Sequence, residues 1–317
     1  MFLRPARASI GRVPSVPFRI LTLLAALSAW ALVVVGGLVR VTESGLGCPD
    51  WPLCHGDVVP LERQAPLIEY SHRATATVVA VLVVLVAVWV LRSYRRRRDV
   101  VVPAVVAAML VPFQALLGAI VVWLELPPWI VAIHFVVGML FLATTVVTAA
   151  RARRRSLGVT QAFLRTVWSG NAVALVLVSL GAAVVAGHAD EACGRQWPAC
   201  NGGFVAGGGS AMLHVAHRSV AYVVAALAVA LAALACRGAA PRMAAFVPLV
   251  AVAAQIGFGI SIVLTEEGTR IRQVFEVLHV AGAAAVWASL VGVAAFLGPP
   301  SRRRVPLESV AAPAPAR

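Results

Sequence analysis

The sequence predicts an all-α membrane protein of eight transmembrane helices, arranged as two similar four-helix bundles. Three observations lead to this fold class: the composition, the number of long apolar runs and an internal repeat. Of the 317 residues, 61% are hydrophobic, and the mean hydropathy is +0.89. A transmembrane helix needs about 20 apolar residues, so a chain this apolar can supply several of them.

Eight apolar runs are long enough to cross a bilayer. The first run follows a basic N-terminus, but it is too long for a signal-peptide core of roughly 7–15 residues. We therefore expect it to be a retained span. The eight expected spans are residues 20–40, 69–91, 100–123, 129–150, 165–186, 211–235, 243–264 and 274–297.

The arginines predict the orientation of the chain. The formal net charge is +14, and all 27 basic residues are arginine. They gather at the N-terminus, in the even-numbered connections, such as RSYRRRR and RARRR, and in the C-terminal tail. Because cytoplasmic loops are rich in Arg and Lys, we expect a multi-pass protein of the cell membrane with both termini cytoplasmic. Its partners would be lipid and not nucleic acid. The outward loops would be residues 41–68, 124–128, 187–210 and 265–273.

Three motifs occur twice, in the same order and about 145 residues apart. GCPDWPLCHG matches ACGRQWPACNG, the His72-Arg73 pair matches His217-Arg218, and His134 matches His279. Each copy contains four spans, so both insert with the same orientation and form a parallel repeat. We divide the chain into an N-terminal bundle at 1–158, a C-terminal bundle at 159–300 and a Pro/Ala-rich tail at 301–317 that we expect to be disordered.

The four repeated histidines are candidate metal ligands. We expect His72 in the first turn of its helix and His134 about two turns into its own, which places the rings at similar depth. His217 and His279 repeat this arrangement. A single buried histidine can be satisfied by a neighbouring carbonyl, but two matched pairs inside the membrane indicate a functional site. Facing imidazoles in a four-helix bundle suit the axial ligation of haem iron, whereas zinc requires further ligands.

Glu69 distinguishes the two halves. It shares a helix face with His72 at a spacing of three residues, and His214 occupies its place in the second half. Glu69 could accept a proton or hold water beside a reacting group. Alternatively, a glutamate in the first turn of a helix only interacts favourably with the helix dipole. His214 could hydrogen-bond a haem propionate or simply pack.

Arg73 and Arg218 directly follow the first histidine of each pair. A guanidinium can bind a haem propionate through two parallel hydrogen bonds. The alternative is that both side chains extend to the outer membrane interface.

The cysteines of the outward loops are expected to be oxidised. Both pairs lie in a compartment that favours disulfides, so we predict Cys48–Cys54 and Cys193–Cys200. A redox role for the first disulfide stays open. The remaining Cys236 is expected on the cytoplasmic side. Mid-span Gly118 and Gly259 suggest close helix packing.

As a set, these residues resemble the heme A synthase family, membrane enzymes that oxidise a methyl group of haem O to the formyl group of haem A. The resemblance covers about residues 20–297. It is carried by SGLGCPDWPLCHG, Glu69, His72-Arg73, His134, the second cysteine pair, His217-Arg218 and His279.

The resemblance implies a role for each matched residue. His72 and His134 would hold the substrate haem, and His217 and His279 would hold a haem b cofactor. Glu69 would be the catalytic carboxylate, and the two cysteine pairs would be disulfides. Water would supply the oxygen, and electrons would leave through haem b to an acceptor such as a quinone. Haem O synthase would be a partner.

Two other functions are compatible with paired histidines. One is a di-haem b cytochrome that only transfers electrons, and the other is a haem carrier or assembly factor for a terminal oxidase. Glu69 separates the enzyme from the cytochrome, because an electron carrier has no use for a carboxylate in one half alone. Two histidines saturate an iron and leave no site for O2, which favours oxidation at the edge of the macrocycle.

Overall fold

A computed structural model describes residues 13–57, 64–153, 158–200, 202–203 and 208–297. These residues form eight helices and no strand, and all eight helices are long and apolar enough to cross a membrane. The predicted all-α fold with eight membrane-crossing helices is therefore confirmed. The tail at 301–317 lies outside the described residues. The helices are α1 (Val16–Val41), α2 (Gln64–Ser93), α3 (Arg98–Trp123), α4 (Pro128–Ala152), α5 (Gln161–Ala186), α6 (Gly209–Cys236), α7 (Met243–Leu264) and α8 (Arg270–Phe296).

The start of α2 differs from the prediction and changes the position of the candidate residues. The helix begins at Gln64, five residues before the expected 69, and contains Pro66 in its first turn. Proline is tolerated there because the first N–H groups have no partner inside the helix. His72 is therefore about two turns inside the helix, and its predicted place in the first turn was wrong. Glu69 also lies beyond the first turn, where the dipole effect has faded.

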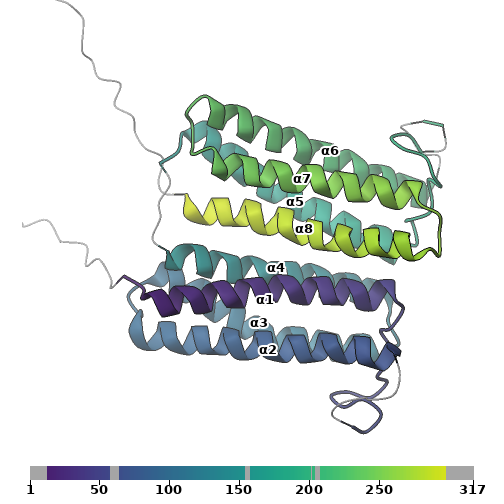
Figure 1. Cartoon of the computed structure of the whole chain (residues 1–317), viewed down its shortest axis with the longest axis horizontal. Helices are drawn as coiled ribbons and strands as arrows, with labels where there is room; N and C mark the ends of the chain where they lie inside the picture. The colour runs from purple at the N-terminus through teal and green to yellow at the C-terminus, as the bar shows by residue number, and fades with distance from the viewer. Residues whose placement is uncertain (1–12, 58–63, 154–157, 201, 204–207, 298–317) are drawn as a thin grey trace, which may run out of the picture.

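The helices pack as two rings of four. In the first ring α1 and α3 each contact α2 and α4, and in the second α5 and α7 each contact α6 and α8 in the same way. The rings meet along α1, α4, α5 and α8, so the two halves lie side by side (Figure 1).

Two tryptophans and a glycine join the halves. Trp30 of α1 donates its indole N–H to the carbonyl of Ala281 in α8 (3.1 Å), and Trp287 of α8 donates to the carbonyl of Met139 in α4 (2.8 Å). A Cβ added to Gly37 would lie 2.9 Å from the side chain of Val280. Small residues allow this close approach of helix backbones inside a membrane.

The two connections that carry the paired cysteines lie at the same end of the molecule. We call the described residues 42–57 the first cysteine loop and the described residues 187–200 and 202–203 the second cysteine loop. The start of α1 and the end of α8 lie at the opposite end (Figure 1). The cysteine loops are thus placed over the beginnings of α2 and α6, the helices that carry His72 and His217.

Candidate functional site

The structure brings the repeated histidines together in pairs. In the second half, the ring centres of His217 on α6 and His279 on α8 are 6.5 Å apart, with the ring planes at 64°. In the first half, His134 on α4 lies close enough to His72 on α2 for the two rings to interact electrostatically. The two histidines of each pair lie on alternate helices of one four-helix bundle and face the interior of that bundle.

Each histidine ring lies against a glycine of the helix that precedes it. A Cβ added to that glycine would approach Cε1 of the ring, closely enough in three of the four cases that the ring would have to move. The separations would be 3.0 Å for Gly36 and His72, 3.5 Å for Gly118 and His134, 3.2 Å for Gly181 and His217, and 3.1 Å for Gly259 and His279.

Two of these glycines, Gly36 and Gly181, were not identified from the sequence. Gly118 and Gly259 were predicted to allow close packing, and they do so against the histidines themselves. Gly36 and Gly181 also stand 145 residues apart. Extending the repeat to the first span of each half would have identified them.

Each of the four rings also has a buried nitrogen atom. The Nδ1 atoms of His72, His134, His217 and His279 are buried, and none makes a hydrogen bond of regular geometry within the described part of the chain. Backbone groups of Leu32, Leu177 and Gln255 nevertheless lie close enough to interact with the rings of His72, His217 and His279. Leaving a buried polar atom unpaired costs about 1–3 kcal/mol, and native interiors contain few such atoms. Their matched positions show that the two bundles hold their histidine pairs in the same way.

The residues present fit a haem iron better than a bare metal ion. Among the described residues, no group of three or more His, Cys, Asp or Glu side chains could hold a metal ion, as a zinc site requires. A haem iron needs only axial ligands from the protein. The separation of 6.5 Å between the rings of His217 and His279 suits an iron between them, because each metal–imidazole bond is about 2 Å long.

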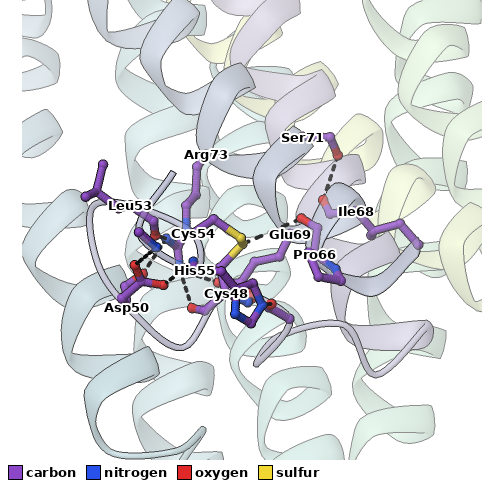
Figure 2. The surroundings of a disulfide bond; sticks show 12 residues. Cys48, Asp50, Leu53, Cys54, His55, Pro66, Ile68, Glu69, Ser71 and Arg73 are labelled. Atoms are coloured by element: carbon purple, nitrogen blue, oxygen red, sulfur yellow. Dashed lines mark hydrogen bonds and ion pairs between the residues drawn. A yellow bond between two sulfur atoms is a disulfide. The ribbon is translucent and has the colours of Figure 1, made fainter. Parts of the chain in front are cut away.

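Glu69 is buried and ties α2 to the first cysteine loop. Only 4% of the residue is exposed. One carboxylate oxygen accepts a hydrogen bond from the backbone N–H of Cys48 (2.8 Å), and the other accepts one from Arg73 (Figure 2). An ionised carboxylate offers about four acceptor positions. Glu69 therefore retains acceptor capacity for a proton or a water molecule, one helical turn from His72.

The two arginines hold the cysteine loops in place. Arg73 donates through Nη1 to the carbonyls of Asp50 and Leu53, and through Nη2 to the carbonyl of Cys48 (Figure 2). Arg218 donates through Nη1 to the carbonyls of Gln196 (2.9 Å) and Ala199 (3.0 Å). Neither loop contact was predicted, and propionate binding by either arginine stays a prediction.

The second half has an unpaired donor where the first half has an ion pair. Nη2 of Arg218 is buried and has no partner in the described region, whereas Nη2 of Arg73 donates to Glu69. His214 occupies the position of Glu69, is 8% exposed, and its ring interacts with the backbone of Ala189 and with Arg218. The histidine in place of the carboxylate thus leaves Nη2 of Arg218 open to an anionic ligand.

Both predicted disulfides are formed, and the two cysteine loops share a backbone pattern. Cys48 is bonded to Cys54, and Cys193 to Cys200. Cys54 and Asp57 exchange two backbone hydrogen bonds, as do Cys200 and Gly203.

A side chain closes each cysteine loop in the same way. Asp50 accepts from the N–H groups of His55 and Gly56, and Gln196 accepts from the N–H of Gly202. The hydrogen bond from Gly56 lowers the pKa of Asp50. Asp50 and Gln196 are therefore equivalent, which aligns the two loops residue by residue.

Comparison with known proteins adds an independent observation. A protein-family model described as COX15-CtaA, cytochrome oxidase assembly protein, matches residues 19–291. The chain is 33% identical to the heme A synthases of Exiguobacterium sibiricum and Halalkalibacterium halodurans, over 58% and 59% of its length. These matches span 65% and 66% of the two relatives, just under two thirds. This chain is also 30% identical to the heme A synthase of Alkalihalophilus pseudofirmus, over 64% of its own length and 71% of that relative.

Proposed function

The chain belongs to the COX15-CtaA family of cytochrome oxidase assembly proteins, and from this premise we propose that it oxidises the methyl group of haem O to the formyl group of haem A. The observation that carries this proposal is the difference between two otherwise matched histidine pairs. Only the pair His72/His134 has a buried carboxylate, Glu69, one helical turn away. A site that reacts and a site that only transfers electrons would differ in this way.

The N-terminal bundle is the proposed substrate site. His72 and His134 would hold the iron of haem O, since their rings come together from α2 and α4. Glu69 would accept protons as the methyl group is oxidised first to an alcohol and then to an aldehyde, with water supplying the oxygen. The hydrogen bonds from Cys48 and Arg73 fix the carboxylate in one orientation.

The C-terminal bundle is the proposed site of a haem b cofactor. His217 and His279 would be its axial ligands. The chemistry that haem b supplies when bound is reversible one-electron transfer. Arg218 would bind a propionate, because its Nη2 atom is buried and lacks a partner in the described chain, and His214 beside it would contribute to this site. Arg73 is a weaker candidate for the other haem, since its guanidinium already donates to four acceptors.

The arrangement in the membrane and the partners are part of the proposal. Both termini would be cytoplasmic, because the arginine-rich connections lie at the end of the bundle opposite the cysteine loops (Figure 1). Both haems would then lie near the outer face. Haem O synthase would deliver the substrate, and an electron acceptor such as a quinone would reoxidise the cofactor.

Haem extraction from purified protein tests the proposed function. The protein would be expressed with a source of haem O, and its pigments separated and identified. We expect haem A and haem b from the unchanged chain, only haem b from His72→Ala, and loss of haem b from His217→Ala. Recovery of haem b alone, with no haem A from any preparation, would instead support the di-haem cytochrome.

A further inference from the structure

The four histidine rings are matched in position, but one of them is held differently from the other three. Each ring lies against a glycine of the preceding helix, and in three cases Nδ1 faces that helix. A Cβ added to Gly36, Gly181 or Gly259 would lie 3.4, 3.6 or 3.5 Å from Nδ1 of its histidine. A Cβ added to Gly118 would approach Cε1 of His134, at 3.5 Å, and no other described atom within 4 Å.

The three rings whose Nδ1 faces a helix also have a backbone carbonyl beside them. In each case this carbonyl belongs to the residue four positions before the glycine, one helical turn away. A helical side chain covers the turn that precedes its own Cα, so a glycine leaves that carbonyl open to the ring. The carbonyls and rings are those of Leu32 and His72, Leu177 and His217, and Gln255 and His279.

His134 has no such carbonyl beside its ring within the described part of the chain. The residue four positions before its glycine is Gln114, which matches Gln255 in the second half. Gln114 makes its contact through the side chain instead, because Nε2 donates to the backbone carbonyl of His134 at 3.2 Å. Gln114 therefore fixes the helix that carries His134 and leaves the imidazole ring itself without a backbone contact.

This difference predicts that His134 is the weaker ligand. A metal-bound histidine ordinarily donates its second ring N–H to a carbonyl or carboxylate, which orients the ring and makes it a better ligand. Loss of such a contact typically lowers metal affinity about 10–100-fold. The one histidine that lacks the contact lies in the proposed substrate site, which has to release a haem in every turnover.

We propose that His134 is the exchangeable ligand of the substrate site: it leaves the iron when haem A departs and haem O enters, while His72 stays bound. Only the bond between the iron and the ring nitrogen of His134 breaks in this step, and its electron pair returns to the ring, so nothing is oxidised or reduced. His217 and His279 keep their haem because both rings are held. Our assignment of exchange to His134 rests on the proposed function, which makes the first site the substrate site.

Carbon monoxide binding measures ligand release, because the gas binds only an iron that has lost a histidine. Purified protein loaded with haem O and haem b would be reduced with dithionite and mixed with carbon monoxide, and the absorbance followed. We expect two phases whose rates both saturate with the gas, the faster by about tenfold or more. In His134→Ala the fast phase should no longer saturate, since its iron is already open, and the slow phase should stay unchanged.

A matched pair of substitutions within the first site gives a second readout. His134→Ala should keep its haem as five-coordinate high-spin iron on His72, whereas His72→Ala should lose it. Equal haem loss from the two variants, or a single phase of carbon monoxide binding in the unchanged protein, would overturn the assignment while haem A is still formed. A first site that takes up no haem in the unchanged protein would overturn the proposed function as well.

The mobility of the histidine rings in the haem-free protein tests the inference without a ligand or a folding-sensitive variant. Protein labelled with ¹³C in its histidine rings would be studied by nuclear magnetic resonance. We expect the ring of His134 to show faster motion than the rings of His72, His217 and His279, which face backbone carbonyls. Equal mobility of the four rings would contradict the proposal.

Discussion

The carboxylate of Glu69 accepts a hydrogen bond of 2.8 Å from the backbone N–H of Cys48, so the proposed catalytic group also anchors the first disulfide. A single substitution at this position therefore affects chemistry and loop structure together. Two different substitutions can separate the effects, because only one of them keeps an acceptor for Cys48.

Glu69→Gln should abolish haem A formation and keep the hydrogen bond from Cys48, while losing the ion pair with Arg73. Its side-chain carbonyl can still accept from Cys48, but the amide cannot take up a proton, and we expect a loss of at least about 100-fold in rate. Glu69→Ala should lose activity equally and also expose Cys48–Cys54 to reduction. The measurements are pigment analysis and the rate of reaction with an added thiol. Normal haem A from Glu69→Gln would contradict the proton-accepting role.

His214→Glu should supply the missing partner of Arg218. The new carboxylate would pair with Nη2, as Glu69 does with Arg73, and the haem-free protein should gain about 1 kcal/mol of stability. For a chain of this size this raises the melting temperature by roughly 2 °C.

The same substitution should weaken haem b binding. If Arg218 binds a propionate, a carboxylate at position 214 would compete with the propionate for the guanidinium and would place two negative charges side by side. A haem titration of His214→Glu, with His214→Gln as the neutral control, measures this. An unchanged affinity in His214→Glu would show that Arg218 does not contact the cofactor.

Gly259→Ala should disturb the second histidine pair through its added methyl group. The new Cβ would lie 3.1 Å from Cε1 of His279, whereas a Cβ at Gly257, on the same helix, would meet nothing within 4 Å. We expect Gly259→Ala to lower the haem content by about tenfold, while Gly257→Ala keeps it, because only the first substitution displaces a ligand ring. The haem absorbance per protein measures both. Equal haem content in the two variants would show that the glycine contact is not needed for ligation.

The helices, the histidine pairs and the family could be predicted from the sequence because each depends on a pattern that repeats. The family match over residues 19–291 confirms the resemblance to heme A synthase. The early start of α2 could not be predicted, because Gln64 to Leu67 lie outside the apolar run and their helix depends on the loop that packs on it. The partners of Arg73 could not be predicted either, since backbone carbonyls are acceptors that every residue provides.

Arg73→Lys should loosen the first cysteine loop more than Arg218→Lys loosens the second. Arg73 engages the carbonyls of Cys48, Asp50 and Leu53 as well as Glu69, and a lysine ammonium cannot reproduce this planar set of donors. Arg218 engages its loop through Nη1 alone, and Arg195 keeps that loop attached to α7. Trapping of free thiols after brief reduction measures both loops. We expect Cys48–Cys54 to open about tenfold faster in Arg73→Lys, and Cys193–Cys200 to change by less in Arg218→Lys. The opposite order would mean that Arg195 contributes little to holding the second loop.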